Sequence, residues 1–302
     1  MTADEIIRLL EQEGPLTGAQ LVEATGMEVF ALWSTCKKLP AVRFDIVGTR
    51  FLRLDRAVHG YARLSPSIRR EFLTYTLLGV ESQIKLLKER AAALKSEIKR
   101  ISCAKLELAR ESMASVVVSL EERNAIIDKT CFIIAGDVVY NMSHTVPRPE
   151  KSTGEMVRGS DLDIIAIVED DLPDSLFKAL DKAIYRKKHF LLVHPDYREE
   201  IDYIIKNMTR AREQVRFDSF EAMVACKILR EGKLLHGSPP LFGRVKDLLE
   251  EFQIPQKLDE MERQALLGRA AAERYLLDLP ADSFDSESFH LFYTREEGEE
   301  IY

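Results

Sequence analysis

The stretch VRGSDLDIIAIVED, residues 157–170, decides the fold because it joins an apolar strand to two acids at its start. Asp161 and Asp163 are separated by one residue, and side chains at positions i and i+2 of a strand point to the same face. Leu162 and Ile164 then point to the opposite face, toward a core. Two adjacent carboxylates repel each other, and without a cation one of them tends to take up a proton. The pattern therefore predicts a strand that holds a divalent cation at its edge.

A third acid lies downstream in EEIDYIIKNM (199–208), an apolar run that is itself predicted to be a strand. An isolated acid such as Asp202 is costly there unless it has a partner or a metal. Oxygen ligands at this spacing suit Mg²⁺ or Mn²⁺ rather than zinc. Two such ions about 4 Å apart can clamp the attacking and leaving oxygens of a phosphoryl displacement. We therefore expect Asp161, Asp163 and Asp202 to bind metal, with Asp202 also helping to deprotonate the attacking hydroxyl.

Other interpretations of these acids remain open. Glu199 and Glu200 are alternatives to Asp202 as the third ligand. Asp161 and Asp163 are also compatible with an ordinary polar start of a strand.

The periodicity of apolar residues from residue 129 onward predicts an α/β unit followed by a helical tail. The expected strands are KTCFIIAGDVVY (129–140), broken at Gly136, then 161–170, HFLLVHP (189–195) and 199–208. The expected helices cover 173–189, 219–233, 240–252 and 258–279.

Residues 1–75 read as three short helices followed by a two-stranded hairpin. The helices are expected at 2–14, 16–26 and 27–40, and the hairpin at 42–54 around Gly48. This order resembles the winged helix-turn-helix family. Basic residues on the third helix and the wing suit contacts with DNA phosphates, namely Lys37, Lys38, Arg43 and Arg50. A wing used for protein contact is the alternative.

Residues 76–128 form the predicted helical connector. Leu77, Ile84, Ala91 and Ile98 recur every seven residues, and a second series runs from Val80 to Leu108. These are the two apolar positions of a heptad, which predicts a coiled-coil homodimer through 77–108, parallel or antiparallel. The alternative is a helix that packs on other helices of its own chain.

The acid pattern resembles the polymerase-β-type nucleotidyltransferase superfamily, in its minimal and kanamycin-type forms. The matching segments are FIIAGD (132–137), GSDLDIIAIV (159–168) and EEIDYII (199–205), followed by ACKILREGKLLHGSPPL (225–241). The resemblance covers about residues 125–250. It implies a mixed sheet flanked by helices, a metal-bound nucleoside triphosphate such as ATP, and transfer of a nucleotide with loss of pyrophosphate.

The sequence departs from that family in its first motif. The family has Gly-Ser or Gly-Gly where this chain has Gly136-Asp137, and an acid beside a triphosphate repels it. The following insert carries cations and small donors that could grip phosphates instead: Arg148, Lys151, Ser152, Thr153, Gly154 and Arg158. A solvated lid is the alternative. The residues expected to bind the nucleotide are Gly136, Asp137, Lys151, Arg158, Ser160 and Lys227.

Composition narrows the class of protein. With 46 % hydrophobic and 31 % charged residues the 302-residue chain reads as globular, and its net charge of −7 argues against a protein wrapped in nucleic acid. The four cysteines form no zinc or disulfide pattern, and no apolar run reaches membrane-spanning length. We therefore expect a cytoplasmic protein without membrane contact.

These observations predict an α+β, multidomain protein. The expected parts are a winged helix (1–75), a connector (76–128), a nucleotidyltransferase-like core (129–245) and a helical tail with an acidic end (246–302). The favoured function is metal-dependent nucleotidyl transfer to an unidentified hydroxyl. The alternative is a DNA-binding regulator whose inactive nucleotidyltransferase-like domain senses a nucleotide. A toxin–antitoxin or phage-defence role rests on family analogy alone.

Overall fold

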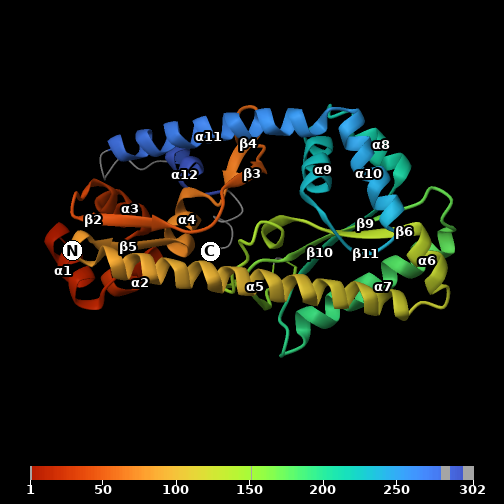
Figure 1. Cartoon of the computed structure of the whole chain (residues 1–302), viewed down its shortest axis with the longest axis horizontal. Coiled ribbons are helices and arrows are strands. Elements are labelled where there is room, and N and C mark those ends of the chain that lie inside the picture. Colours follow the sequence, from red (N-terminus) through yellow and green to blue (C-terminus); the bar gives the residue numbers. More distant parts are fainter. Residues whose placement is uncertain (1, 151, 280–285, 295–302) are drawn as a thin grey trace. The chain divides into compact units, whose positions relative to one another are not determined.

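The computed structural model describes residues 2–150, 152–279 and 286–294 and confirms a mixed α+β fold (Figure 1). The chain forms two compact units, one of Met1–Glu97 with Met261–Tyr302 and one of Ile98–Glu260. The divisions fall inside two long helices, α5 (Ile84–Val118) and α11 (Ile254–Asp278). Each of these helices therefore contributes residues to both units.

The first unit contains the N-terminal helices, two small sheets and the C-terminal helices. Its helices are α1 (Ala3–Glu13), α2 (Gly18–Thr25), α3 (Val29–Lys38), α4 (Ile68–Tyr75), η1 (Glu81–Gln83) and α12 (Ser286–Phe292), with parts of α5 and α11. Its strands are β1 (Leu16–Thr17), β2 (Val42–Ile46), β3 (Phe51–Leu54), β4 (Ala62–Ser65) and β5 (Thr76–Val80). One sheet has the order β1-β5-β2, and β3 pairs with β4.

The three predicted N-terminal helices are confirmed, and local chemistry explains their ends. Thr2 and Thr17 each begin a helix with a capping box, in which the threonine hydroxyl accepts from the third residue of the helix. Gly26 ends α2 in the left-handed region at φ +65°, a conformation that favours glycine.

The predicted wing hairpin of residues 42–54 is wrong. β2 pairs antiparallel with β5, and β3 pairs antiparallel with β4, so the two predicted partners do not pair with each other. β5 is a fully buried strand between β1 and β2. Its apolar run reads equally well as a helix when the sequence is the only guide.

The predicted heptad helix begins too early. Leu77 and Val80 lie in β5, and α5 begins only at Ile84. The glycine between them packs closely, because a Cβ at Gly79 would lie 3.2 Å from Pro15. Within α5, Leu87 and Ala91 are already buried in the chain, whereas Ile84 is exposed.

The core of the first unit is aromatic. The rings of Phe30, Trp33 and Phe292 pack against one another with centroids 5.4–5.9 Å apart. Leu276 of α11 is buried in the same cluster. The strongly acidic end predicted for the chain lies mostly outside the described residues.

The second unit is built on a four-stranded mixed sheet. Its strands are β6 (Thr130–Ile134), β9 (Leu162–Val168), β10 (Ile201–Asn207) and β11 (Lys233–Gly237), with a separate hairpin of β7 (Pro147–Pro149) and β8 (Met156–Arg158). Its helices are α6 (Arg123–Lys129), η2 (Gly136–Val138), α7 (Asp174–Val193), α8 (Met208–Gln214), α9 (Phe220–Glu231) and α10 (Pro239–Glu251). The sheet order is β10-β9-β6-β11, with β10 parallel to β9 and the other pairs antiparallel.

The predicted strands at 129–140, 161–170 and 199–208 are confirmed as β6, β9 and β10, but the strand at 189–195 is wrong. Helix α7 continues to Val193, and Leu191 extends the buried face that Leu180 and Ile184 begin. A run of four apolar residues does not distinguish a strand from the end of a helix. Strand β11 and the β7–β8 hairpin were not predicted.

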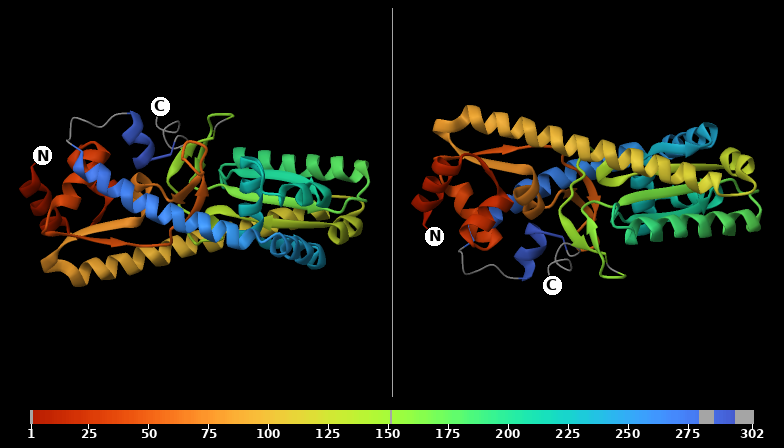
Figure 2. Two further views of the ribbon diagram at one scale, coloured as in Figure 1. Left: turned by 90° about the horizontal axis from the view of Figure 1, so that it is seen from above. Right: turned by 90° about the horizontal axis from the view of Figure 1, so that it is seen from below.

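The two faces of the sheet carry different chemistry. Leu162, Ile164 and Ala166 of β9 pack in the core with α5 and α7, which lie on one side of the sheet in both views (Figures 1 and 2). Residues alternate along a strand, so Asp163 and Ile165 point to the opposite side, toward α9 and α10. The predicted acids therefore lie on the face away from α5 and α7.

Candidate functional site

Asp163 and Asp202 are direct neighbours on the sheet. β9 and β10 are parallel, and Asp202 is the register partner of Asp163. Partners in adjacent parallel strands share a face at a strand spacing of about 4.8 Å. Asp161 lies two residues before Asp163, immediately ahead of β9. The structure thus brings together the three acids that the sequence predicted at one end of the sheet.

Asp137 joins this group from the turn after β6. Its negative charge raises the pKa of both Asp161 and Asp163, which places it among the same acids. The Ser160 hydroxyl donates to the Asp137 carboxylate at 2.9 Å, so Ser160 holds Asp137 rather than Asp161. We call Asp137, Asp161, Asp163 and Asp202 the acid edge.

Gly136 is required by the close approach of two strands. It has φ +69°, and a Cβ there would lie 2.0 Å from Asp163 Oδ2. A side chain at this position would therefore push directly on the acid edge. The first-motif glycine thus serves to bring the β6 turn against the carboxylate of Asp163.

For Asp161 and Asp163, two members of the acid edge, the surroundings disfavour the charged form of the carboxylate. Burial by the surrounding protein raises the pKa of Asp163 well above its usual value, and the charges of Asp161, Asp137 and Asp202 raise it further. Burial also raises the pKa of Asp161, against the opposing effect of Arg148. The Asp161 side chain keeps 39 % of its accessible surface. The Asp161 carboxylate is therefore partly desolvated but still accessible to a ligand.

Two basic side chains compensate the acid edge in part. Arg148, on β7, lies 2.8 Å from Glu200 and 3.7 Å from Asp161. Lys227, on α9, lowers the pKa of Asp163 through its positive charge. Its ammonium also pairs with Glu231 at 2.6 Å. Both cations are thus shared with further carboxylates, so negative charge still predominates at the edge.

Glu231 is the residue of this site that sequence reasoning missed. Its carboxylate accepts from the Gly136 amide at 3.1 Å and from the Tyr140 hydroxyl at 2.7 Å, besides pairing with Lys227. Its position four residues after Lys227 on a helix was the available signal. Glu231 thus links α9 to the turn after β6. It accepts the hydrogen bond of the Gly136 amide, a group that the family resemblance predicts to bind a phosphate oxygen.

The insert does not present its donors as predicted. Lys151 lies outside the described residues. Ser152 and Thr153 donate their amides and hydroxyls to the buried carboxylate of Glu150. The Arg158 guanidinium donates to the Asp196 carbonyl at 3.2 Å. Of the basic residues of the insert, Arg148 is the one shown close to the acid edge.

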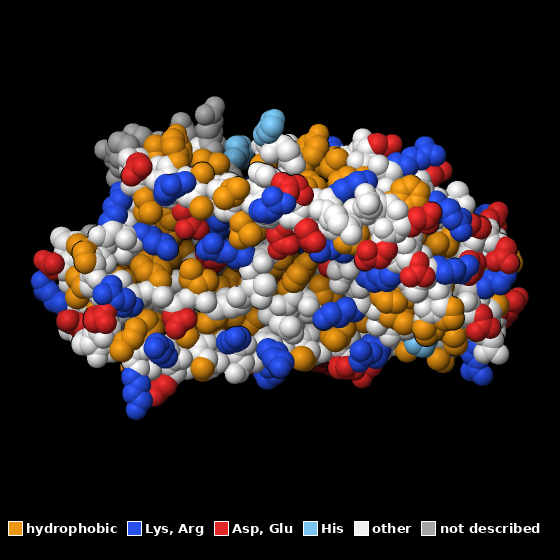
Figure 3. All heavy atoms as spheres, turned by 45° about the horizontal axis from the view of Figure 1, so that its top comes forward, with side chains coloured by type: hydrophobic (Ala, Val, Ile, Leu, Met, Phe, Trp, Pro, Cys, Tyr) orange, Lys and Arg blue, Asp and Glu red, His pale blue; other side chains and the backbone are white. Residues whose placement is uncertain are grey.

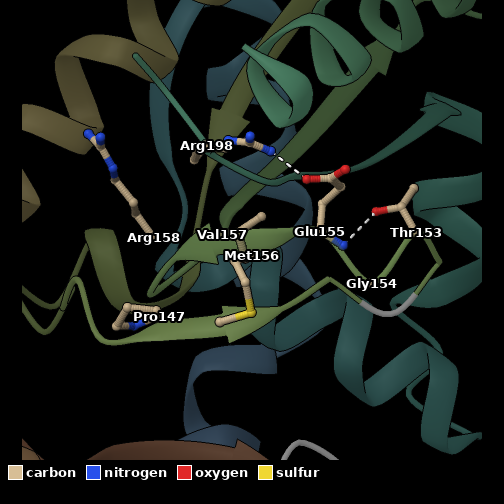
Figure 4. A pocket seen from close by; sticks show the side chains of 8 residues that line it. All are labelled: Pro147, Thr153, Gly154, Glu155, Met156, Val157, Arg158 and Arg198. Atoms are coloured by element: carbon tan, nitrogen blue, oxygen red, sulfur yellow. Dashed lines mark hydrogen bonds and ion pairs between the residues drawn. The ribbon is translucent and has the colours of Figure 1, made fainter. Parts of the chain in front are cut away.

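Arg158 lines a separate pocket of about 540 Å³ next to the hairpin (Figure 4). Pro147 and Met156 of the hairpin line it from one side, and Arg198 pairs with Glu155 on the other. The Arg158 side chain points away from Glu155 and Arg198 in this view. Pro147 and Arg158 are register partners, as are Arg148 and Val157. The two pairs occupy opposite faces of the hairpin, and Arg148 is on the side of the acids.

The two alternatives to Asp202 have other partners. Glu199 is buried and pairs with Lys105 of α5. Glu200 pairs with Arg148. Asp202 is the most exposed of the three and lies beside Asp163, which makes it the best placed to act on a ligand.

The predicted DNA-contacting residues of the first unit are partly engaged within the chain. Arg50 donates two hydrogen bonds to Glu71, and Arg43 pairs with Glu81. Lys37 lies over the ring of Phe44 at 4.5 Å. Lys38 is exposed in the last turn of α3.

The donor set at the acid edge fits a hard divalent cation in chemistry but is not closed around one. In the described part of the chain, no group of three His, Cys, Asp or Glu side chains is already arranged to hold a metal ion. All the donors are oxygens, which is the ligand type that Mg²⁺ prefers. A bound cation would also stabilise the charged carboxylates of Asp161 and Asp163 and so lower their raised pKa values. Asp161, Asp163 and Asp202 are the residues that would hold it.

Comparisons with known proteins do not identify a family. No protein-family model matches the chain, and neither does any curated protein. Within the described residues, no helix is both long and apolar enough to cross a lipid bilayer.

Proposed function

We propose that this protein is a metal-dependent nucleotidyltransferase, which moves a nucleotide from a nucleoside triphosphate to an acceptor hydroxyl and releases pyrophosphate. The observation that carries the proposal is the acid edge. Asp163 and Asp202 are register partners on parallel strands, and Asp161 and Asp137 lie close enough to raise the pKa of Asp163. Gathering like charges in a desolvated place is costly unless a ligand neutralises them.

The chemistry assigned to each residue follows from its position. Asp202 is exposed and takes the proton of the acceptor hydroxyl. The acceptor oxygen then forms a bond to the α-phosphorus while the bond between that phosphorus and the pyrophosphate oxygen breaks. Pyrophosphate leaves with the electron pair. Lys227 is positioned beside Asp163 to contact a phosphate oxygen.

A bound Mg²⁺ or Mn²⁺ would supply positive charge for the phosphate oxygens and for the leaving group. Asp161, Asp163 and Asp202 would hold it in this proposal. Gly136 keeps the β6 turn against Asp163, and Ser160 restrains Asp137 through their 2.9 Å hydrogen bond.

The sheet topology supports the resemblance to the polymerase-β-type superfamily. The glycine turn follows β6, the acid pair stands at the start of β9, and the third acid lies on β10. These three strands are adjacent and form a mixed sheet. Helices lie on both sides of it, as the resemblance implies (Figure 1). The Gly-Asp motif and Glu231 are departures that a test of activity has to address.

The experiment that tests the proposal is label transfer from α-labelled nucleoside triphosphates. The full chain is incubated with each triphosphate, Mg²⁺ or Mn²⁺, and a crude cell extract as the source of acceptors, and both labelled product and pyrophosphate are measured. We expect transfer that disappears in Asp161→Ala and Asp163→Ala. The matched control is Asp181→Ala on α7, which removes an acid from the opposite side of the sheet. Transfer that survives both acid-edge substitutions would refute the proposal.

A second function is favoured by one specific observation. The Gly136 amide is already bound to Glu231, and Asp137 stands where the related motif has a neutral donor. Such a site would bind a nucleotide without turnover, and the N-terminal unit, with exposed Lys38 on α3, would then be the part that binds DNA. Triphosphate binding without pyrophosphate release, together with salt-sensitive binding to duplex DNA that Lys37→Gln with Lys38→Gln weakens, would favour this regulator.

A further inference from the structure

The outward side of α7 differs from the rest of the second unit in its charge. The segment KAIYRKKHF (182–190) contains four lysines and arginines and no acid, in a chain whose net charge is −7. Six exposed residues of α7 each lie three or four positions from another member of the set, namely Lys178, Lys182, Tyr185, Arg186, His189 and Val193. We call these six residues the cationic face. Because the opposite side of α7 packs in the core, this face is directed away from the sheet.

The lysines and arginine of the cationic face form no ion pair with the acids that the structure describes. In the described part of the chain, no Asp or Glu lies within ion-pair distance of Lys178, Lys182 or Arg186. Some exposed cations of the same unit do pair with acids, for example Lys129 with Asp171 and Arg212 with Asp170. On the face that carries α10, acidic and basic side chains alternate (Figure 3). The cationic face is thus a local excess of positive charge.

The helix itself does not account for these cations. Positive side chains stabilise a helix when they lie in its last turn, near the negative end of the macrodipole. The last turn of α7 contains no basic residue, and the cations lie earlier. Four cations within nine residues instead repel one another, and a bound polyanion would relieve that repulsion.

Aromatic and aliphatic groups are exposed among the cations. Tyr185 keeps 59 % of its surface, Phe190 43 % and Val193 42 %. Lys187 lies over the Phe190 ring at 5.6 Å, and the rings of Phe190, His194 and Tyr197 form a group with centroids 4.9–5.8 Å apart. Exposed rings interleaved with cations are the features that bind unpaired bases and phosphates of a single strand.

The cationic face leads toward the acid edge along the chain. After α7, residues 194–200 carry His194, Tyr197 and Arg198, and β10 then begins with Ile201 and Asp202. β10 is an outer strand of its sheet. A ligand that contacts both α7 and Asp202 has to pass around this strand, so it must be extended rather than a small molecule.

We propose that the cationic face of α7 binds single-stranded nucleic acid, the polymer whose end supplies the acceptor hydroxyl at the acid edge. The identity of the acceptor rests on the proposed nucleotidyltransferase function, whereas the binding surface rests on α7 alone. Duplex DNA offers phosphates but no unstacked bases to the rings of Tyr185 and Phe190. A single strand offers both.

The test measures binding of the full chain to a fluorescein-labelled 20-nucleotide RNA of mixed sequence, to its DNA equivalent and to the corresponding duplex, by anisotropy between about 50 and 200 mM salt. The face variant is Lys178→Gln with Lys182→Gln and Arg186→Gln. The matched control is Lys85→Gln with Lys88→Gln and Lys95→Gln, three exposed lysines of α5 that change the net charge equally.

We expect the face variant to bind a single strand at least tenfold more weakly at 50 mM salt. Its slope of log K against log salt should fall by about 2, because each lost phosphate contact accounts for about 0.7. The control should change affinity less than twofold. Tyr185→Ser should weaken binding at least fivefold, since stacking on one ring contributes about 1–3 kcal/mol.

Several outcomes would overturn the inference: no binding at 50 mM salt, equal losses in the face variant and the control, or a duplex bound as tightly as the single strand. Binding only to vesicles of 70 % phosphatidylcholine and 30 % phosphatidylserine would assign the face to lipid instead. Asp163→Asn separates the two proposals, because it should keep strand binding while abolishing label transfer. If the chain binds a single strand through the cationic face but shows no transfer activity, the proposed binding surface stands and the proposed nucleotidyltransferase function is refuted.

Discussion

Two clusters of charged side chains in this protein differ in how far their charges are compensated. In the first unit, Glu71 accepts a bidentate pair of hydrogen bonds from Arg50 and a further bond from Arg269, which also pairs with Glu273. Two acids meet two cations, and the Arg269 guanidinium also donates to the Pro66 carbonyl at 2.9 Å. We call these four residues the Glu71 cluster. Its charges are balanced by the chain itself.

The acid edge of the second unit is not balanced in this way. Asp137, Asp161, Asp163 and Asp202 share Arg148 and Lys227, and both of these cations also pair with other carboxylates. The pKa of Asp163 is accordingly raised well above its usual value, chiefly by burial and then by its acidic neighbours. A charge-balanced ion-pair network stabilises the fold by itself. A cluster with excess negative charge is stabilised further when it binds a cation. The contrast separates a structural use of buried charge from a functional one.

The largest expected change in stability comes from a substitution in the Glu71 cluster, whose charges are balanced. Glu71→Gln leaves Arg50 and Arg269 in a poorly solvated place without their common partner. We expect it to lower the free energy of unfolding by about 3–5 kcal/mol, because an uncompensated buried charge is costly. Chemical denaturation measures the change. Glu81→Gln is the control, since its pair with Arg43 is exposed and should contribute less than about 1 kcal/mol. Equal effects of the two substitutions would contradict the distinction.

The next prediction compares alanine substitutions at two glycines of similar backbone conformation. It tests how much the close approach of Gly136 to Asp163 matters for stability. Gly136 has φ +69° and Gly26 has φ +65°, but only the former has Asp163 against the position of a Cβ. Gly26→Ala should cost about 1 kcal/mol from the left-handed backbone alone. Gly136→Ala should cost about 3 kcal/mol, because the carboxylate must also move. Thermal denaturation compares them, and equal costs would show that the contact with Asp163 contributes nothing.

A cation should stabilise one of the two charge clusters and not the other. Mg²⁺ at ten times its dissociation constant should raise the free energy of unfolding by about 1.4 kcal/mol through preferential binding to the folded state. Asp163→Asn should abolish this response and should be no less stable than the wild type without Mg²⁺, since it removes one of several repelling charges. Glu273→Gln, in the Glu71 cluster, should retain the response. The midpoint of thermal unfolding in MgCl₂ and in KCl of equal ionic strength measures all three.

Glu150 offers a third way to keep a carboxylate buried, and it has the smallest expected effect. Burial alone would raise its pKa, but hydrogen bonds from Ser152 and Thr153 outweigh burial and lower the pKa from 4.5 to about 2. Because the folded pKa is depressed, this stabilisation is present above pH 4.5 and is lost as the pH falls through about 2. Glu150→Gln should therefore cost about 1 kcal/mol at pH 7 and almost nothing near pH 2. A cost independent of pH would assign the effect to packing of the hairpin.

The sequence was sufficient where local chemistry sets the structure. The pattern of residues 2–14 and 16–26 predicted the first two helices, and alternation along 161–170 predicted both strand β9 and the common face of its two acids. Strand β10 was predicted from its apolar run, and with it the position of Asp202. These features depend on residues close together in the chain, whose spacing is visible without a fold.

Pairing between distant segments was decided only by the tertiary structure. The run that contains Leu77 and Val80 is compatible with a helix or a strand, and it became a central strand because β1 and β2 flank it. Glu231 reaches Gly136 across 95 residues of sequence, so its role depends on how α9 packs against the β6 turn. Whether a charged residue is balanced, as Glu71 is, or left among like charges, as Asp163 is, follows from contacts made in space. Spacing along the chain therefore established the kinds of groups present, and packing established which of them meet.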